Sequence, residues 1–224
     1  MIISLTMNGK ETLNKMIKTY DNIHATYTSK QFLNFIDVKD VNVIVEGGSR
    51  DLVDALYLEQ HFNNAQIHSF ECNEEAYAIC SKNLNRSKGR IKLNKLAMTN
   101  KNGELSFYAF DHNVTDHHDI GVSSLYKHKD QNGVPQKEIT VLGTRLDTYC
   151  NNNNITSIDY LCLDVQGAEQ SVLEGLGNML TTIKYIVLEN DSSFYSDAPE
   201  ISEQLLTNFK VVSKICNDSL YIRK

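Results

Sequence analysis

Short apolar runs alternate with tight turns and amphipathic helical segments from residue 41 onward, and this alternation restricts the fold more than any other feature of the chain. The first run, Val43 to Val45, leads through a Gly-Gly turn into a helical pattern that begins at Leu52. Each helix must carry the chain back across one face of a sheet before the next strand starts. The sequence therefore predicts an α/β fold with a mostly parallel sheet and helices on both faces.

Further strands and helices follow the same alternation. Apolar residues at helical spacing also occur before residue 41, at Leu13 to Tyr20 and at Phe32 to Ile36. Two later helices each have one apolar face. The first carries Ala76, Ile79, Cys80 and Leu84, and the second carries Val172, Leu173, Leu176 and Leu180. The predicted strands are Gln66 to Glu71, Arg90 to Met98, Glu104 to Phe110, Ile158 to Asp164, Lys184 to Glu189, and a closing antiparallel hairpin from 209 to 222.

A chain of 224 residues suits one domain with a well-buried core. We expect a helical extension over residues 1–40, packed on a single domain over 41–224. The stretch from Asp111 to Thr140 interrupts the alternation, because it is polar, rich in histidine and longer than the usual connection. It is either a lid-like insertion that shapes a substrate site or a mobile surface loop, and the sequence leaves both open.

The composition argues against several classes of protein. The formal net charge is -6 and the Lys and Arg residues are scattered, whereas nucleic-acid binders gather them on one face. No apolar run approaches the ~20 residues of a membrane-spanning helix. The first nine residues do not resemble a secretory signal, so we expect a cytoplasmic protein. The five cysteines include no CxxC pair, which disfavours a disulfide framework or a structural zinc site.

The candidate site lies at the ends of the predicted strands, where open α/β sheets bind their ligands. The first strand ends in Glu46-Gly47-Gly48, and glycines there let the backbone approach a ligand closely. Ser49-Arg50-Asp51 follows, without the third glycine of a GxGxxG dinucleotide loop. An acidic rim suits a cationic ligand better than a pyrophosphate, and S-adenosylmethionine, with its sulfonium and ammonium groups, fits this requirement.

Three further strand ends carry acids. Glu71 ends the second strand 25 positions after Glu46 (71 − 46), near the interval at which a ribose-binding acid follows a glycine loop. An ionised carboxylate has only acceptors, which match the two donors of a ribose diol. Asp164 and Glu189 end two later strands, and they flank one cleft if those strands are neighbours. These converging acids predict a site that serves cofactor and substrate together.

The order of these segments resembles the FkbM family of S-adenosylmethionine-dependent methyltransferases over roughly residues 41 to 190. The matching segments are VIVEGGSRD, HSFECNEEAYAICSKNL, LAMTNKNGELSFYAF, GVSSLYKH, the strand-like EITVLGTRLDTYC, and DYLCLDVQGAEQSVLEGL. The resemblance implies a Rossmann-like methyltransferase fold, in which a mostly parallel seven-stranded sheet has an antiparallel C-terminal strand. It also implies methyl transfer from S-adenosyl-L-methionine to a hydroxyl of a small metabolite, sugar or glycan.

The resemblance assigns roles by position. Around the cofactor it places Glu46 and Gly47 at the methionine end, Gly48 and Ser49 in the same turn, Glu71 at the ribose, Cys72, Asn73, Leu96 and Ala97 near the adenine, and Asp164 at the reacting centre. On the substrate side it places Ser123, Ser124, Gln166 and Glu169. The helix dipole explains an acid at Glu169 equally well, because that residue lies in a first helical turn.

The chain departs from the family pattern at two places. The usual run of acid, glycine, Ala-Asn and glycine is replaced by Gly48-Ser49-Arg50, with Leu52 following Asp51. The usual DxEGxE appears with Gln166 in place of its middle acid, which counts against a metal or carboxylate-base role there. Both departures keep open the alternative of a non-catalytic module that retains the fold as an interaction platform.

Methyl transfer to a hydroxyl needs a base that takes the hydroxyl proton. The candidates are Asp164, Glu189 and His117 of the insertion. Adjacent histidines suit a single metal ion poorly, so we predict no metal site. A nucleotide-dependent enzyme on the same sheet is a further alternative, which the missing third glycine disfavours. We expect a small-molecule or carbohydrate substrate and no nucleic acid or membrane partner, while the acceptor's identity and the oligomeric state stay open.

Overall fold

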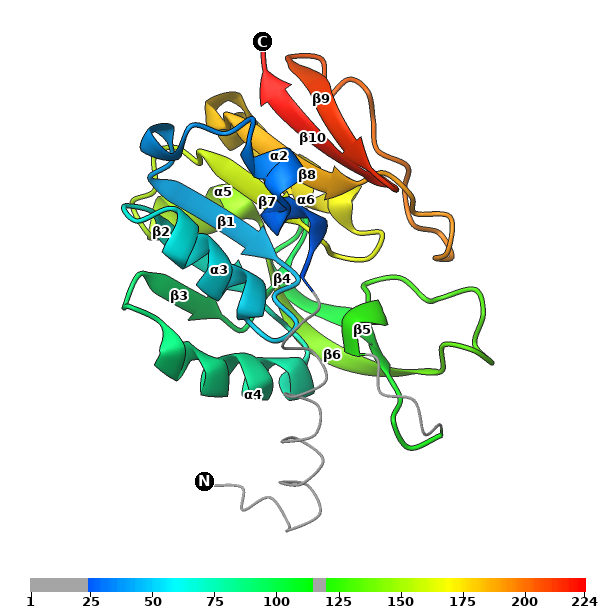
Figure 1. The fold of residues 1–224 in the computed structure, drawn as a ribbon. Coiled ribbons are helices and arrows are strands. Elements are labelled where there is room, and N and C mark those ends of the chain that lie inside the picture. The colour runs from blue at the N-terminus through cyan, green and yellow to red at the C-terminus, as the bar shows by residue number, and fades with distance from the viewer. Residues whose placement is uncertain (1–23, 115–119) are drawn as a thin grey trace.

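The computed structural model describes residues 24–114 and 120–224 of the chain. Its centre is a seven-stranded sheet with the order β3-β2-β1-β7-β8-β10-β9 (Figure 1). The first five strands in this order are parallel, and β10 runs antiparallel to both of its neighbours. The strands are β1 Val43–Gly47, β2 Gln66–Phe70, β3 Ile91–Asn94, β7 Tyr160–Leu163, β8 Tyr185–Glu189, β9 Phe209–Ile215 and β10 Asp218–Arg223. The predicted fold class is confirmed.

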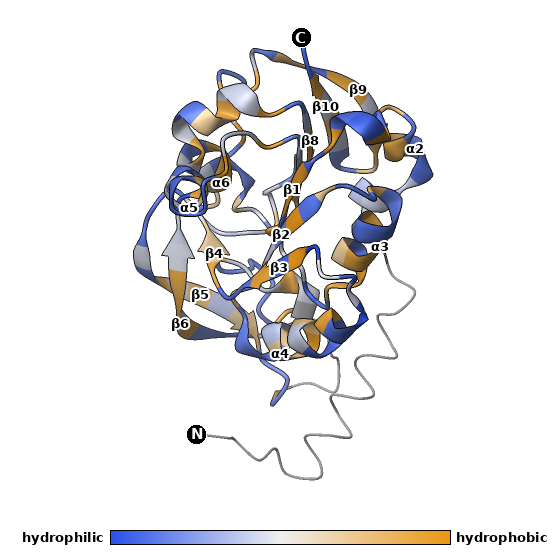
Figure 2. Ribbon diagram, turned by 90° about the vertical axis from the view of Figure 1, so that its left-hand side faces the viewer, coloured by the Kyte–Doolittle hydropathy of each residue, from blue (hydrophilic) through white to orange (hydrophobic). Residues whose placement is uncertain are grey.

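Helices cover both faces of this sheet. Successive residues of a strand point to opposite faces, so neighbouring residues pack against different helices. Ile44 packs with residues of the three helices between residues 30 and 83, whereas Val45 packs with residues of the two helices between residues 146 and 175. A sheet buried on both faces favours nearly continuous apolar strands, and β1, β7 and β8 have them, whereas the edge strand β3 and its neighbour β2 include polar residues. The helices are α2 Lys30–Leu33, α3 Val53–His61, α4 Glu74–Asn83, α5 Leu146–Asn152 and α6 Glu169–Gly175. Figure 2 shows β1, β2 and β3 between a helix on the right, α3, and two helices on the left, α5 and α6.

A second, three-stranded sheet stands beside the first, with the order β4-β6-β5. It consists of β4 Ala97–Met98, β5 Gly103–Phe110 and β6 Gln136–Thr144, of which β5 and β6 form an antiparallel pair. The predicted single strand from Arg90 to Met98 is wrong, since the chain leaves the large sheet after Asn94 and joins the small one. The Asn94 side chain donates to backbone oxygens of Ser69 (3.1 Å) and Lys92 (3.0 Å) and so ends β3.

Two other sequence boundaries also move. Residues 136–140, which the sequence assigned to the insertion, belong to β6, so the connection between β5 and β6 is shorter than expected. The segment EITVLGTRLDTYC is a strand only as far as Thr144, because Leu146–Asn152 is α5. The alternating polar and apolar residues of 136–144 suit a strand in a small, half-exposed sheet, and their polar content is similar to that of a loop.

The described part of the N-terminal extension packs on the sheet. Tyr27, Phe32 and Ile36 are buried in the same cluster as Ile44, whereas Phe35 is 48 % exposed. The helical pattern from Leu13 to Tyr20 lies outside the described residues. Among the residues that are described, no helix combines the length and the apolar character needed to cross a membrane.

Candidate active site

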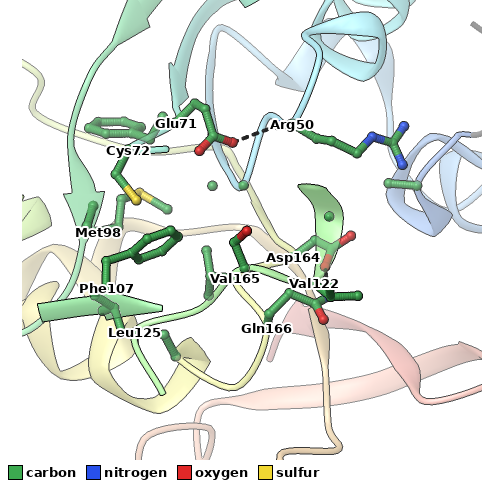
Figure 3. A pocket seen from close by; sticks show the side chains of 18 of the residues that line it. Arg50, Glu71, Cys72, Met98, Phe107, Val122, Leu125, Asp164, Val165 and Gln166 are labelled. Atoms are coloured by element: carbon green, nitrogen blue, oxygen red, sulfur yellow. Dashed lines mark hydrogen bonds between the residues drawn. The ribbon is translucent and has the colours of Figure 1, made fainter. Parts of the chain in front are cut away.

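A cavity of about 260 Å³ opens at the carboxyl ends of β1, β2 and β7 (Figure 3). The strand order reverses here, because β1 pairs with β2 on one side and with β7 on the other. Ligands of open α/β sheets bind at such reversal points, where two neighbouring loops lead away to opposite faces. The fold therefore places a cavity where the sequence predicted a ligand site.

The turn after β1 is held tightly against the end of β7. Gly48 has a φ of +82°, and a Cβ at this position would lie 1.9 Å from the backbone oxygen of Asp164. The Asp164 backbone N–H donates to the Gly47 oxygen (3.1 Å). Only glycine combines this φ with this close contact. The glycine turn thus brings Asp164 to the wall of the cavity.

Glu71 lies at the end of β2, directly beside this turn. Its two carboxyl oxygens accept backbone N–H groups of Arg50 (2.9 Å) and Asn73 (2.8 Å) (Figure 3). Burial raises the pKa of Glu71 to about 7, although these hydrogen bonds oppose the rise. Each carboxyl oxygen has more than one acceptor site, so Glu71 can still accept hydrogen bonds from a ligand in the cavity.

The cavity has an apolar side and a polar side (Figure 3). Cys72, Met98 and Phe107 line one side, and Asp164 and Gln166 line the other. The lining contains three carboxyl groups but, among the described residues, only one Lys or Arg side chain. These charged residues are Asp54, Glu71, Asp164 and Arg50. The polar side is therefore suited to a ligand that carries positive charge.

Asp164 combines cavity access with a raised pKa. Removal from bulk water raises the pKa of its carboxyl, while hydrogen bonding by Gln166 and the charge of Arg50 act in the opposite direction. The Gln166 Nε2 group donates to Asp164 Oδ1 at 2.6 Å. A carboxylate whose pKa lies above its ordinary value is a better proton acceptor than an exposed one.

The cavity brings together most of the residues that the sequence assigned to cofactor and substrate. Those that line it are Gly47, Gly48, Glu71, Cys72, Leu96, Ala97, Ser123, Asp164 and Gln166. Ser123 accepts hydrogen bonds from the Phe110 backbone (3.0 Å) and from Asn73 Nδ2 (3.3 Å). The connection between β5 and β6 therefore reaches the cavity, as its match to the GVSSL segment suggested.

Glu46 and Ser49 lie beneath the glycine turn and do not line the cavity. Glu46 is fully buried and accepts hydrogen bonds from Tyr27 Oη (3.0 Å) and Ser49 Oγ (2.7 Å). Burial raises the pKa of Glu46 to about 7. The sequence indicated the right turn but not the direction of this side chain, because the Tyr27 partner comes from the N-terminal segment.

Asn73, Ser124 and Glu169 support the walls of the cavity from outside its lining. Asn73 Oδ1 caps α4 by accepting the Glu75 backbone N–H (2.9 Å). Ser124 Oγ donates to the Gln166 backbone oxygen (2.5 Å), and Glu169 Oε1 accepts the Val165 backbone N–H (3.0 Å). Burial raises the pKa of Glu169 to about 8. These contacts hold the walls of the cavity in place.

The two other candidate bases are Glu189 and His117. Glu189 ends β8, which neighbours β7, but it does not line the cavity. Burial and the nearby charge of Asp164 raise the pKa of Glu189 to about 7. His117 lies outside the described residues. Within the described ranges, no group of three or more His, Cys, Asp or Glu side chains is arranged to hold a metal ion.

Sequence reasoning missed several residues that line the cavity. They are Ala25, Tyr27, Arg50, Asp54, Phe70, Met98, Phe107, Gly121, Val122, Leu125, Val165 and Ala168. Phe70 and Val165 flank predicted site acids, so their positions could have been inferred from their neighbours. Ala25 and Tyr27 had no signal, because no motif connects the N-terminal segment to the strand ends.

Comparisons with known proteins show which proteins this chain is similar to. The sequence model described as the methyltransferase FkbM domain matches residues 42–210. The chain is 27 % identical over 224 residues to the 2-O-methyltransferase NoeI of Sinorhizobium fredii, and the match covers 96 % of this chain and 89 % of that protein.

Two solved structures share the fold. One is a Staphylococcus aureus protein assigned as a caffeoyl-CoA O-methyltransferase, with a TM-score of 0.53 and 11 % identity over 96 % of this chain and 91 % of that chain. The other is a Klebsiella pneumoniae protein assigned as an O-methyltransferase, with a TM-score of 0.51 and 9 % identity over 100 % of this chain and 92 % of that chain.

Proposed function

Because this chain belongs to the methyltransferase FkbM family, it is a methyltransferase, and we propose that it uses S-adenosylmethionine to methylate a hydroxyl oxygen of a small metabolite or carbohydrate. The observation that carries the proposal is the buried carboxyl of Glu71, which borders a glycine turn and faces a cavity at the reversal point of the sheet. The name of the relative NoeI, a 2-O-methyltransferase, supports oxygen as the atom that is methylated.

The residues of the cavity fit this cofactor. Met98, Phe107 and Leu125 offer an apolar surface for an adenine ring, and Glu71 offers acceptors for a ribose diol. The turn at Gly47 and Gly48 lines the cavity beside Asp164, where the methionine end would bind. The acidic polar side favours a sulfonium and disfavours a pyrophosphate, which supports this cofactor over a nicotinamide or another nucleotide.

When bound, S-adenosylmethionine supplies an electrophilic methyl group on a positively charged sulfur. The protein has to orient an acceptor hydroxyl and take its proton, and we assign the proton to Asp164, which lines the cavity and has a raised pKa. Positioning of this kind can contribute as much as about 7–11 kcal/mol to lowering a barrier. We do not assign the proton to Glu189, because its side chain lies outside the lining of the cavity.

The acceptor side is formed by Val122 and Ser123 of the β5–β6 connection together with Gln166. These are uncharged groups that suit a neutral, hydroxylated molecule. A nucleic acid would instead meet the carboxyl groups of Asp54 and Asp164 without a basic face around them. We therefore propose a small molecule or carbohydrate as the acceptor.

Calorimetry with S-adenosylhomocysteine and NAD tests the cofactor assignment. We expect S-adenosylhomocysteine to bind and NAD not to bind. Glu71→Ala should weaken S-adenosylhomocysteine binding about 10- to 100-fold, because hydrogen bonds to a charged group contribute about 1.5–3 kcal/mol. Glu104→Ala, an exposed change in β5, is the matched control and should bind normally. Wild-type protein that binds NAD, or neither ligand, would contradict the proposal.

Replacement of Asp164 separates binding from catalysis. Asp164→Asn removes the proton acceptor but keeps the shape of the side chain, so we expect S-adenosylhomocysteine binding within about threefold of wild type. Transfer of a labelled methyl group to a panel of monosaccharides and small alcohols should fall about 100-fold or more, within the usual range for a lost general base. An Asp164→Asn protein with undiminished transfer would remove Asp164 from the mechanism.

A further inference from the structure

Gln166 is held by hydrogen bonds at both ends of its side-chain amide and at its backbone. Its Nε2 donates to Asp164 Oδ1 (2.6 Å), and its Oε1 accepts from Tyr195 Oη (2.7 Å). Its backbone oxygen accepts from Ser124 Oγ (2.5 Å). The residue has a φ of +54°, a left-handed conformation that is unfavourable outside glycine. Such a conformation persists when surrounding contacts determine it, as they do here.

The partners of Gln166 come from two segments that pair with each other. Ser124 belongs to the β5–β6 connection, and Tyr195 belongs to the segment between β8 and β9; Figure 1 shows these two segments side by side. Backbone hydrogen bonds join them, from Lys129 to Phe194 (2.9 Å) and from Ser196 to Lys127 (2.7 Å). Gln166 thus contacts both segments and Asp164.

An amide is the side chain that this arrangement requires. Its N–H end meets a carboxylate and its oxygen end meets a phenol O–H, so each partner is satisfied by a different atom. A glutamate at position 166 would place a second carboxylate where the donor to Asp164 now lies. Two carboxyl groups that lie so close to each other can both ionise only at a high cost in free energy. The departure from DxEGxE therefore has a physical role in this chain.

We propose that Gln166 is a positioning residue that fixes the Asp164 carboxyl in the cavity and lowers its proton affinity, and that Tyr195 sets the orientation of the Gln166 amide. This inference rests on the proposed function, in which Asp164 takes the acceptor proton. Without the Tyr195 hydroxyl, the amide can turn and present its oxygen to Asp164. The segment between β8 and β9 thereby controls the state of the base.

Other charged groups also act on Asp164, and they are the same in the wild-type protein and in variants at residues 166 and 195. Arg50 stabilises its ionised form, whereas the neighbouring acids oppose ionisation. The titratable groups that interact with it are Tyr27, Arg50, Asp54, Glu169, Glu189 and Asp218. A change confined to residue 166 or 195 leaves all of these groups in place. A change in the pH at which Asp164 titrates therefore reports the hydrogen bonds that join Tyr195, Gln166 and Asp164.

The test is a titration of Asp164 in the full chain, followed by NMR of ¹³C-labelled aspartate carboxyl groups and assigned with Asp164→Asn. We expect Gln166→Glu to move the Asp164 titration upward by at least one pH unit. Gln166→Met, which has a similar volume and no donor, should move it upward by less. Tyr195→Phe should also move it upward, because the amide loses its fixed orientation.

The outcomes separate this inference from the proposed function. Calorimetry with S-adenosylhomocysteine should give Tyr195→Phe, a change outside the cavity lining, an affinity within about threefold of wild type, which shows that the cavity is intact. An Asp164 titration that stays at the wild-type pH in Gln166→Glu overturns the role of Gln166, and one that stays there in Tyr195→Phe overturns the role of Tyr195. Failure of the wild-type protein to bind S-adenosylhomocysteine overturns the cofactor assignment, whatever the titration gives.

Discussion

Leu52 has a left-handed backbone, with a φ of 70°, directly before α3. A leucine in this conformation costs about 1–2 kcal/mol. Its side chain is completely buried in the cluster that includes Tyr27 and Ile44. Removing a buried leucine side chain costs about 2–5 kcal/mol, so burial outweighs the backbone strain and leucine is tolerated.

The balance at Leu52 predicts an unusual order of stabilities. Leu52→Ala loses the burial and keeps the strain, whereas Leu52→Gly loses the same burial but releases the strain. We expect both variants to be less stable than wild type, with Leu52→Ala the less stable of the two by about 1 kcal/mol. Urea unfolding followed by circular dichroism measures the difference. At Leu56 of α3, which has ordinary helical geometry, the same pair should give the reverse order.

An alanine variant at position 52 that equals or exceeds the glycine variant in stability would show that the turn relaxes when the leucine is removed. In that case the strained turn is a consequence of side-chain packing rather than a property of the Gly47–Leu52 loop. The comparison thus distinguishes two origins for the backbone geometry beside the cavity.

Strands and helices were predictable where one periodicity ran without interruption. β1, β7 and β8 are nearly continuous apolar runs, and α4 has one apolar face, so their positions follow from burial alone. The split between β3 and β4 was not predictable, because it depends on the Asn94 side chain meeting a backbone oxygen of a neighbouring strand. Local pattern contains no information about such a tertiary contact.

The candidate site was predictable to the same extent. Strand ends identify Glu71 and Asp164, since parallel strands bring their carboxyl ends to one edge. The direction of a side chain at such an end depends on partners that are distant in sequence. Glu46 turns away from the cavity because Tyr27, 19 residues earlier, donates to it. Gln166 faces Asp164 partly because Tyr195 holds its other end.

The segment before α2 forms a wall of the cavity and is attached through α3. The Ala25 backbone N–H donates to both carboxyl oxygens of Asp54 (3.2 Å each), and His24 Nδ1 lies 2.9 Å from Asp54 Oδ1. Tyr160 Oη donates to the Tyr27 backbone oxygen (2.8 Å). Because Ala25 and Tyr27 line the cavity, these few bonds set the position of that wall.

Removal of the Asp54 carboxyl should loosen this wall. We expect the Ala25 amide to exchange its hydrogen about 10- to 100-fold faster in Asp54→Ala, because a hydrogen bond to a charged group contributes about 1.5–3 kcal/mol. Asp54→Asn keeps one acceptor and should show a smaller increase. Amide exchange followed by NMR measures both. An unchanged Ala25 rate in Asp54→Ala would mean that Tyr27 and its partners hold the segment alone.

Several buried carboxyl groups lie along the edge of the sheet that forms the site. Burial raises the pKa of Glu46, Glu71 and Glu189 to about 7 and that of Glu169 to about 8, from ordinary values of 4.5. The folded protein therefore binds more protons than the unfolded chain between about pH 4.5 and 8. Under this condition the free energy of unfolding decreases as the pH rises. Burial of these carboxyl groups therefore lowers the free energy of unfolding at neutral pH.

The protein should consequently melt at a higher temperature at pH 6 than at pH 8, in contrast to a protein whose carboxylates are held ionised. The lowered pKa values of Glu59 and Asp147 act only at lower pH, whereas those of His61 and His68 oppose the trend near pH 6 but are outnumbered by the four carboxyl groups. Each kcal/mol corresponds to about 2–4 °C for a domain of this size.

Glu169→Gln should reduce the difference between the melting temperatures at pH 6 and pH 8, because it removes the carboxyl group with the highest of the raised pKa values. The exposed Glu104→Gln should leave this difference unchanged. Calorimetric melting without ligand measures all three proteins, and equal melting temperatures at pH 6 and pH 8 would mean that water or local rearrangement keeps these carboxyl groups ionised in the folded state.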